Sequence, residues 1–420
     1  QTPNPKPQTP NPKPREKERC WPKKGTSTRK WVKIFKDSIM LKGVLRRFGS
    51  AIYMWQNGIT KASSKPVRVE LPSGSVSDVV LSDSHFAAIN ESGELFMWGA
   101  NGFGELGLGD LASRATPTLV PRMKGHVIVG VALGKHHTLA LDDKGRVFSW
   151  GQGSFQGTLK SVVTNACMAL GHPRKQNLWL PKQIEALKDV KVVQVSTGYD
   201  FAMALDSKDG VWNWGRHEFG TSGMGNSPHI EPVPNPVLAE ISKQKNTRVK
   251  KIDSCGDYSS VLFENKELYS FGNNDNMAMG IGEATGFESS YSINYPTHVK
   301  DEDGPDPLTE DFALGRSIAL FKRPDNTFWI AGGKKYYYPT HLPFDTKDSQ
   351  VISFASSYKG AGVLTESNQL LAIGDFWCSA PSTTSPETEI ITVDMKASFG
   401  DIKLTKIGGK YRHRFAIVQE

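Results

Sequence analysis

Short apolar runs separated by polar turns occupy most of this chain. A representative pair is residues 137–141 (HTLAL) and 147–150 (VFSW), which flank a polar turn at residues 142–145. Such runs are rich in β-branched and aromatic residues and are too short to form core helices. Two of them joined by a turn that contains Gly predict a β-hairpin.

The same hairpin pattern recurs six times along the chain. In each copy a small residue opens the unit and a Gly closes it about 17 positions later, as Gly134 and Gly151 do. A fixed internal spacing indicates one supersecondary unit that is used repeatedly. We expect the repeat glycines to be structural, because Gly lets backbones approach closely where strands crowd together. They are Gly99, Gly134, Gly151, Gly198, Gly215, Gly256, Gly272, Gly315, Gly332 and Gly374.

Each hairpin is followed by material for further strands. After the closing Gly99 comes a Gly-rich stretch at residues 100–109 and then a Pro-marked strand at residues 116–120. The copies recur every 42 to 64 residues or so, and the longer spacings indicate insertions. That period with mostly strand content predicts an all-β propeller of four-stranded blades.

The repeat resembles that of the regulator of chromosome condensation family. The shared pattern is Gly-x-x-His-x-x-Ala-Leu, a turn, Val-Phe-x-Trp-Gly, and then Asn-x-x-Gly-x-Leu-Gly. Residues 79–110 and 129–157 match it well, residues 195–225 fairly well, and the later copies loosely. The resemblance extends over residues 50–420 and implies a seven-bladed propeller.

The seventh copy is divided between the two ends of the chain. Residues 406–418 resemble the first half of a repeat, and residues 51–58 resemble a second half. Pairing of these N- and C-terminal strands would close the ring and remove exposed strand edges. We therefore expect a closed, monomeric ring over residues 50–420.

The positive charge is concentrated before the ring. Residues 1–50 contain 14 Lys or Arg and three acidic residues, about +11, whereas the whole chain carries +8, so the propeller is mildly acidic at about −3. Residues 1–28 are a Pro/Lys-rich segment in which QTPNPKP occurs twice, and we expect an extended tail. Residues 29–49 form a basic amphipathic segment.

This basic N-terminal extension has several interpretations. It is a solvated tail with a lead-in helix on the propeller, a docking element for RNA or DNA, or an organellar targeting or membrane-contact segment. Its candidate partner- and anion-binding residues are Lys23, Lys24, Arg29, Lys30, Lys33, Lys36, Lys42, Arg46 and Arg47.

Sequence motifs that resemble catalytic or ligand-binding sites are explained as parts of the repeat. Gly102, Gly104 and Gly107 form a G-x-G-x-x-G pattern, but a loop and a Pro-marked strand follow it instead of the helix of a dinucleotide site. The four cysteines have no paired spacing, which argues against a disulfide scaffold and a zinc site. No apolar run approaches membrane-spanning length. We assign no catalytic residue, metal site or cofactor.

The histidines also fit the repeat. His85 and His137 occupy one repeat position, and a position shared across blades favours a structural role, with each imidazole hydrogen-bonded to neighbouring backbone. By the spacing of the copies, the other blades carry Phe201, Ser259, Ile318 and Gly360 at this position.

Insertions are where repeat proteins place variable, functional surface. One insertion is expected near residues 158–182 and another near 282–307. Arg174 and Lys175 in the first, and Lys334 and Lys335 beside a Tyr-rich run, are further candidates for binding a protein or RNA.

Two functional hypotheses follow. The first is a non-enzymatic interaction scaffold, a structural subunit of a large mitochondrial assembly such as a ribosome or respiratory complex, anchored by its basic, acid-poor arm. The second is implied by the family resemblance: guanine nucleotide exchange on a small GTPase with chromatin binding, in the nucleus. Nuclear exchange factors of the family carry an Arg-Asp-Asn-type loop after a Trp-Gly pair, and this chain lacks that acid after Gly99 and Gly151. We therefore assign no exchange residues.

Overall fold

The structure is a computed structural model, and the residues that it describes belong to one compact unit, Val44–Glu420. The described residues are 50–56, 66–153, 169–174, 176–225, 230–237, 246–282, 292–302, 307–344, 349–376, 390–393, 395 and 401–419. The expected tail (1–28) and basic amphipathic segment (29–49), with all nine of their candidate cations from Lys23 to Arg47, lie outside this range. The expected domain boundaries and the role of the arm stay predictions.

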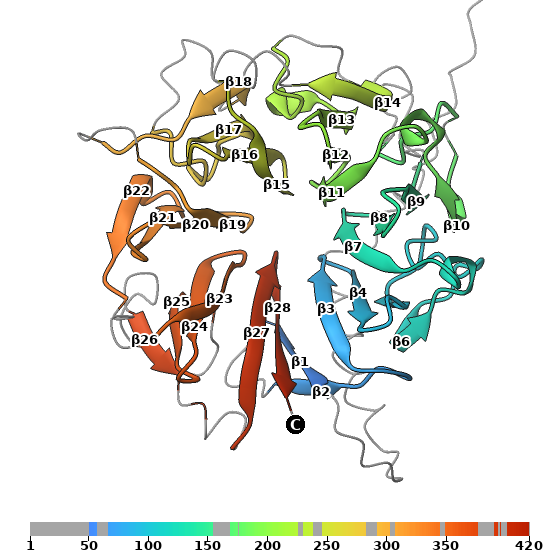
Figure 1. Ribbon diagram of the computed structural model, residues 1–420, viewed down its shortest axis with the longest axis horizontal. Helices are drawn as coiled ribbons and strands as arrows, with labels where there is room; N and C mark the ends of the chain where they lie inside the picture. The colour runs from blue at the N-terminus through green and yellow to red at the C-terminus, as the bar shows by residue number, and fades with distance from the viewer. Residues whose placement is uncertain are drawn as a thin grey trace, which may run out of the picture. The chain divides into compact units, whose positions relative to one another are not determined.

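The described strands form seven four-stranded antiparallel sheets that surround a common centre as blades (Figure 1). Blades 1 to 3 contain β3 (Val76–Leu81), β4 (His85–Asn90), β5 (Leu95–Gly99), β6 (Arg114–Leu119); β7 (Ile128–Leu133), β8 (His137–Asp142), β9 (Val147–Gly151), β10 (Leu178–Gln183); and β11 (Val192–Thr197), β12 (Phe201–Asp206), β13 (Val211–Arg216), β14 (Ile230–Val237).

Blades 4 to 6 repeat this order. They contain β15 (Val249–Cys255), β16 (Tyr258–Phe263), β17 (Leu268–Asn273), β18 (Ser292–His298); β19 (Asp311–Leu314), β20 (Ile318–Lys322), β21 (Phe328–Gly332), β22 (Tyr336–Leu342); and β23 (Val351–Ser356), β24 (Gly360–Thr365), β25 (Leu370–Gly374), β26 (Ile390–Val393). Within the described residues, three short 3-10 helices lie between strands: η1 (Pro121–Met123), η2 (Glu185–Leu187) and η3 (Glu218–Gly220). The predicted all-β, seven-bladed propeller is confirmed.

Blade 7 joins the two ends of the chain. It is built from β27 (Lys403–Lys410), β28 (His413–Gln419), β1 (Ser50–Gln56) and β2 (Val67–Val69). Strand β1 pairs antiparallel with β28 along its whole length, from Ser50 opposite Gln419 to Gln56 opposite His413. The expected closure by N- and C-terminal strands is therefore confirmed.

The hairpin turns are held by acidic or amide side chains at the end of the second strand. Asp142 Oδ1 accepts the backbone N–H groups of Lys144 and Arg146 at 3.1 and 2.9 Å. Asn90 and Asp206 accept equivalent bonds in their own blades. These side chains satisfy turn donors that the sheet leaves free, which is why the turns carry Asx residues.

The closing glycine of each repeat is fixed by a close backbone approach. Gly99 and Gly215 have φ near +108° and +110°. A Cβ at Gly99 would lie 2.6 Å from the Ser84 carbonyl oxygen, and one at Gly215 would lie 2.6 Å from the Asp200 carbonyl oxygen. Only Gly combines this dihedral angle with that clearance.

Tryptophans on the third strands fill the space between blades. Trp98, Trp150 and Trp214 are fully buried. Trp150 Nε1 donates to the Glu105 carbonyl of the preceding blade at 2.7 Å. The loop with the G-x-G-x-x-G pattern therefore packs against the next blade's tryptophan. As predicted, it leads into a strand, β6, and not into a helix.

Candidate functional site

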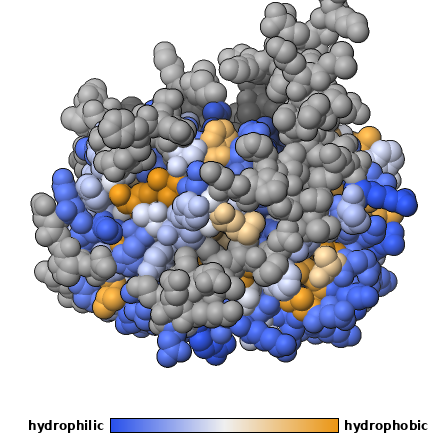
Figure 2. All heavy atoms as spheres, turned by 90° about the horizontal axis from the view of Figure 1, so that it is seen from above, coloured by the Kyte–Doolittle hydropathy of each residue, from blue (hydrophilic) through white to orange (hydrophobic). Residues whose placement is uncertain are grey.

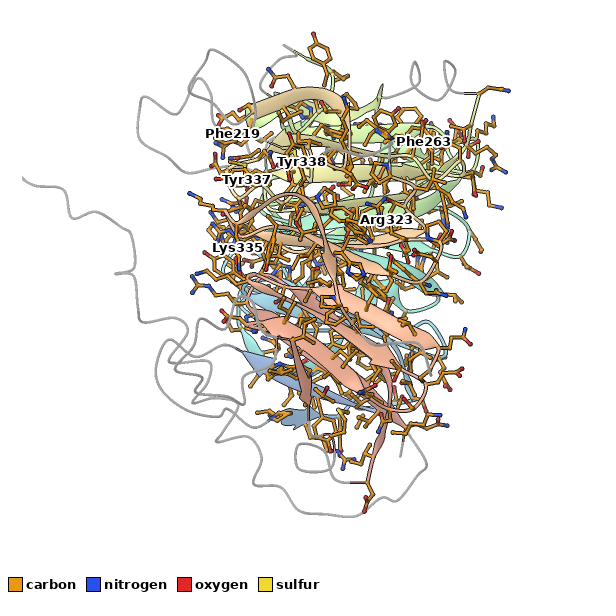
Figure 3. All side chains as sticks on the ribbon, turned by 90° about the vertical axis from the view of Figure 1, so that its left-hand side faces the viewer. Phe219, Phe263, Arg323, Lys335, Tyr337 and Tyr338 are labelled. Atoms are coloured by element: carbon orange, nitrogen blue, oxygen red, sulfur yellow. The ribbon has the colours of Figure 1, made fainter. Side chains whose placement is uncertain are left out.

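Antiparallel strands place equivalent connections of every blade on one face. The turn from the first to the second strand and the connection from the third to the fourth leave each sheet at the same edge. Figure 3 shows Lys335, from such a connection, and Tyr337, at the start of β22, on one side, and Phe263 and Arg323, from the other ends of strands, on the opposite side. We call the first side the turn face. Its first-to-second-strand turns are Asp83-Ser84, Lys135-His136, Tyr199-Asp200, Gly256-Asp257, Arg316-Ser317, Tyr358-Lys359 and Tyr411-Arg412.

Two tyrosines from blades 3 and 7 meet on the turn face. The rings of Tyr199 and Tyr411 stack with centroids 5.2 Å apart and an interplanar angle of 17°. The Gly256 N–H in blade 4 donates to Tyr411 Oη at 3.4 Å, and the Tyr358 N–H in blade 6 donates to the Tyr411 carbonyl. Tyr411 is 1% exposed, and burial raises its pKa well above the usual value. This contact ties together turns that are far apart in the sequence.

Three cations gather around a third tyrosine. The guanidinium of Arg316 lies 5.3 Å from the ring centroids of both Tyr199 and Tyr358. Arg412 and Lys359 lie 5.6 and 6.0 Å from the Tyr358 ring. We call Arg316, Lys359 and Arg412 the cation cluster. Blades 5, 6 and 7 contribute one cation each.

Acidic turns lie in blades 1, 3 and 4. We call Asp83, Asp200 and Asp257 the acidic group. Burial and the nearby Asp200 carboxylate raise the pKa of Asp257 to about 6, against the opposing charges of Arg216, Arg316 and Lys135. Arg216 Nη1 lies 3.5 Å from Asp200 Oδ2. The turn face therefore carries charges of both signs, and blade 3 contributes both in the Asp200–Arg216 pair.

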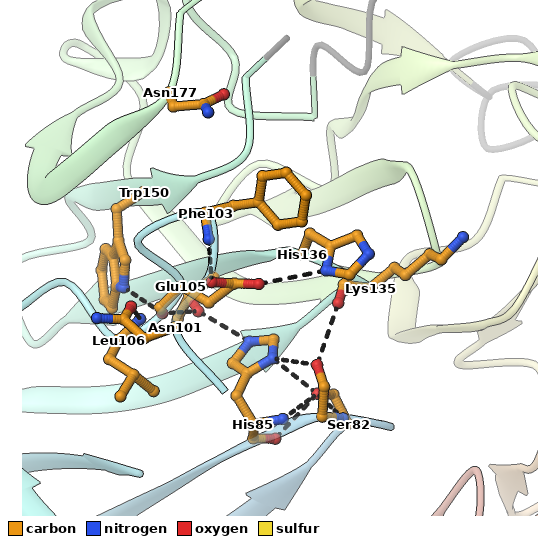
Figure 4. Close-up of polar contacts among 12 residues, drawn as sticks. Ser82, His85, Asn101, Phe103, Glu105, Leu106, Lys135, His136, Trp150 and Asn177 are labelled. Carbon is orange, nitrogen blue, oxygen red and sulfur yellow. Dashed lines mark hydrogen bonds and ion pairs between the residues drawn. The ribbon is translucent and has the colours of Figure 1, made fainter. Parts of the chain in front are cut away.

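A buried carboxylate supports the turn of blade 2 (Figure 4). Glu105 Oε1 lies 3.2 Å from His136 Nδ1, and Glu105 Oε2 accepts the Phe103 N–H at 2.8 Å. Burial alone would raise the pKa of Glu105, but these hydrogen bonds outweigh it and hold the pKa below its usual value. The partly exposed His136 ring is fixed from below.

The predicted backbone bonding of the repeat histidines holds for His85, whose ring bonds to the His137 backbone, and is wrong for His137. His85 Nδ1 also lies 2.9 Å from Ser82 Oγ, and Nε2 lies 3.2 Å from Thr138 Oγ1, so hydroxyls are further partners of this ring (Figure 4). Neither ring nitrogen of His137 has a hydrogen-bond partner. The structural role of both side chains stands, since each is fully buried.

The position that the histidines share is also corrected in blade 4. Tyr258, not Ser259, pairs with the closing Gly272, as His85 pairs with Gly99 and His137 with Gly151. The opening residue of blade 4 is accordingly Cys255, which pairs with Tyr258, and Gly256 is a turn glycine with φ of +63°.

The sequence-predicted cations of the ring lie in third-to-fourth-strand connections. Arg174 is exposed between β9 and β10, and Lys334 and Lys335 are exposed between β21 and β22. Lys335 Nζ lies 5.1 Å from the Tyr336 ring. Lys175 and most of the two expected insertions lie outside the described residues, although residues 178–182 belong to strand β10.

Sequence reasoning missed the cation cluster and the acidic group. Their signal was available: each copy has two residues between the opening small residue and the shared histidine position, such as Tyr199-Asp200 after Gly198. These positions vary from copy to copy, and only the folded ring brings them onto one face. Within the described part of the chain, no group of three or more His, Cys, Asp or Glu could hold a metal ion, and no helix is long and apolar enough to cross a membrane.

Two family models, both described as the regulator of chromosome condensation (RCC1) repeat, match this chain. One covers residues 92–141 and 165–205, and the other covers residues 76–105 and 128–156.

Curated relatives are similar in sequence to part of this chain. The human E3 ubiquitin-protein ligase HERC2 is 31% identical over 53% of this chain, which spans only 4% of that protein. The Arabidopsis thaliana ultraviolet-B receptor UVR8 is 28% identical over 66% of the chain and 58% of the receptor. The Arabidopsis thaliana RCC1 domain-containing protein RUG3, mitochondrial, is 26% identical over 78% of the chain and 73% of that protein.

Solved structures share the fold. Yeast RCC1 (Prp20), in a crystal structure with Kap60, is 18% identical with a TM-score of 0.70, and the match covers 89% of each chain. Human WBSCR16 is 15% identical with a TM-score of 0.68, over 89% of this chain and 99% of that one.

Proposed function

We propose that this chain, which is a seven-bladed propeller of the RCC1 repeat family, is a non-enzymatic scaffold that docks a protein partner on its turn face. The observation that carries the proposal is the charge and ring arrangement of that face. Tyrosines and arginines, which protein interfaces favour, are held there next to carboxylates on a rigid disc. Figure 2 shows the rim of the described ring, which is mostly hydrophilic with small, separate hydrophobic areas.

We further propose that the scaffold belongs to a multi-subunit mitochondrial assembly. The Arabidopsis thaliana relative RUG3, which carries the word mitochondrial in its name, supports the compartment. The basic, acid-poor extension before the ring supports the same compartment and a role in anchoring, including contact with RNA. Both the existence of this assembly and the molecule that the basic extension binds are part of the proposal.

The competing candidate is a nucleotide exchange factor in the nucleus. A crystal structure of yeast Prp20p, described together with its binding to Gsp1p and histones, has a TM-score of 0.70 with this chain at 18% identity. That similarity supports the fold of an exchange factor, and it identifies no residue of this chain that would carry out exchange.

Affinity purification of the intact chain separates the candidates. The tagged protein is purified at low and high salt, and retained proteins and RNA are identified. A defined set of co-purifying proteins that is lost in the double variant Asp200→Asn/Asp257→Asn supports docking on the turn face. Retention of the same set by that variant and by the cation-cluster variants argues against it, and catalysed nucleotide release from a co-purified GTPase establishes the exchange factor instead.

A further inference from the structure

The three cations of the cluster outnumber the two carboxylates, Asp83 and Asp257, that act on them electrostatically. Arg316, Lys359 and Arg412 all lie within 6.0 Å of the Tyr358 ring centroid. Among the residues that the structure describes, no carboxylate forms an ion pair with any of the three. Asp83 accepts a hydrogen bond from the Arg412 backbone N–H and interacts electrostatically with Arg316 and Arg412, and Asp257 interacts electrostatically with Arg316. Three like charges held together in this way favour an anion that would neutralise them.

The cluster is held in place before any ligand arrives. The Arg316 guanidinium lies over the rings of both Tyr199 and Tyr358, at 5.3 Å from each centroid. The Tyr358 backbone N–H donates to Tyr411, whose ring stacks on Tyr199. The Arg412 carbonyl accepts a bond from Arg414 Nη1 at 3.3 Å, and Arg414 is fully buried. Fixed guanidinium groups lose little freedom when they bind, and their planar donors suit a carboxylate.

The neighbouring charges decide the class of ligand. The acidic group, Asp83, Asp200 and Asp257, lies on the same face as the cluster. A continuous phosphate backbone that crossed this face would meet all three carboxylates, whereas a short anionic segment at the cluster would avoid Asp200. Local cations beside local acids therefore fit a protein surface of mixed charge better than a nucleic acid.

We propose that the cation cluster binds the carboxylates of an acidic segment of a partner protein, with Tyr358 as the floor of the site. The proposal rests on the proposed docking role of the turn face and names the chemistry of one part of it. Arg316 and Arg412 hold the carboxylates, and Lys359, which is exposed, closes the third side.

Zero-length crosslinking tests this at a single residue. An N-acetylated peptide of ten glutamates is incubated with the full-length chain and a carbodiimide, which joins carboxylates to lysine amines. Lysines that carry peptide are identified by mass spectrometry. We expect Lys359 to be labelled more strongly than the exposed Lys124, and the double variant Arg316→Gln/Arg412→Gln to reduce the Lys359 conjugate roughly ten-fold.

Arg122→Gln provides the matched control. Arg122 is an exposed arginine in η1, at the opposite ends of the strands from the turn face, and its loss should leave the Lys359 conjugate unchanged. Equal labelling of Lys359 and Lys124, or an unchanged Lys359 conjugate in the double variant, overturns the proposal. So does loss of the conjugate when a ten-nucleotide oligouridylate is added in equal amount, which would assign the cluster to nucleic acid.

The result is separable from the proposed function. If the double arginine variant keeps the Lys359 conjugate while Asp200→Asn/Asp257→Asn still loses the co-purifying proteins, the docking face stands and the carboxylate site fails. If neither variant changes the retained proteins, the docking face itself fails.

Discussion

His85 Nε2 lies 3.2 Å from Thr138 Oγ1, across the boundary between blades 1 and 2. The equivalent bond is missing at the next boundary. His137 occupies the position of His85, but the residue that corresponds to Thr138 in blade 3 is Ala202, since both pair with a third-strand tryptophan. The residue that corresponds to Ser82 is Gly134, which has no side chain. Both imidazole nitrogens of His137 are therefore left without partners.

Replacing His137 by Phe should stabilise the propeller. A buried polar group without a partner costs about 1–3 kcal/mol, and the His137→Phe change removes that cost. Blade 3 shows that the space suffices, because Phe201 occupies the same position beside Gly198, as His137 lies beside Gly134. Urea unfolding followed by circular dichroism should give a higher midpoint for the variant.

The matched substitution at His85 should destabilise the propeller. His85→Phe loses the bonds to Ser82 and Thr138, and it places a larger ring beside Ser82 instead of a Gly. We expect a loss of about 1–3 kcal/mol. Equal effects of the two substitutions would show that the orphaned nitrogens of His137 carry no cost.

Acid sensitivity should also report on His137. Burial lowers the pKa of His137 from 6.5 to about 3, so below pH 6.5 the unfolded chain binds a proton that the folded chain does not. Stability from this group is fully present above the unfolded pKa and falls as the pH drops toward 3. The slope is about 1.4 kcal/mol per pH unit for one proton.

Unfolding of wild type and His137→Phe across this pH range measures the effect. The gain from the substitution should be larger at pH 5 than at pH 8. His85, whose pKa burial lowers to about 4, stays in both proteins and cancels in the comparison. A gain that does not change with pH would contradict a buried, neutral His137.

The fold was predictable because the same structural contacts recur in successive blades. The closing glycines, the buried tryptophans and the Asx turns serve the same contact in several blades, so each copy supports the prediction from the others. The divided seventh blade followed from the same pattern, and the pairing of Ser50 with Gln419 confirms it.

The site was not predictable for the complementary reason. Arg316, Tyr358 and Arg412 lie at turn positions that no repeat contact fixes, and their neighbourhood exists only after seven turns are brought onto one face. The wrong assignment of Ser259, in place of Tyr258, to the shared histidine position has a similar cause. A one-residue shift is visible in the strand register but not in the spacing of the sequence copies. The missing partners of His137 likewise depend on Ala202 in another blade.

Removal of the Tyr411 ring should loosen the turn face. Tyr411→Ala deletes a fully buried aromatic side chain, its stack on Tyr199 and its bond to the Gly256 N–H. We expect a loss of about 3–5 kcal/mol, and about 1 kcal/mol for Tyr411→Phe, which removes only the hydroxyl. Faster hydrogen exchange in the turns at residues 199–200 and 358–359 of Tyr411→Ala should accompany the loss. Unchanged exchange there would show that the stack does not order these turns.

The closing glycines offer the sharpest test of the repeat itself. Gly215 has φ of +110°, and a Cβ there would lie 2.6 Å from the Asp200 carbonyl oxygen and 2.7 Å from Phe201 Cα. Gly125 also has a positive φ, +90°, but nothing lies within 4 Å of its Cβ position. Gly215→Ala adds both strain and a backbone clash, whereas Gly125→Ala adds strain alone. We expect losses of about 3 kcal/mol or more for the first and about 1 kcal/mol for the second.

Thermal unfolding of the two variants separates these contributions. A clear difference between them measures the backbone approach that brings the third strand against the turn-face turns, because the dihedral penalty is common to both. Since Asp200 lies in that turn, Gly215→Ala should also weaken partner retention by the turn face, and Gly125→Ala should leave it intact. Equal melting temperatures would mean that the closing Gly is required only for its positive φ. The close backbone approach would then not determine where the turns lie.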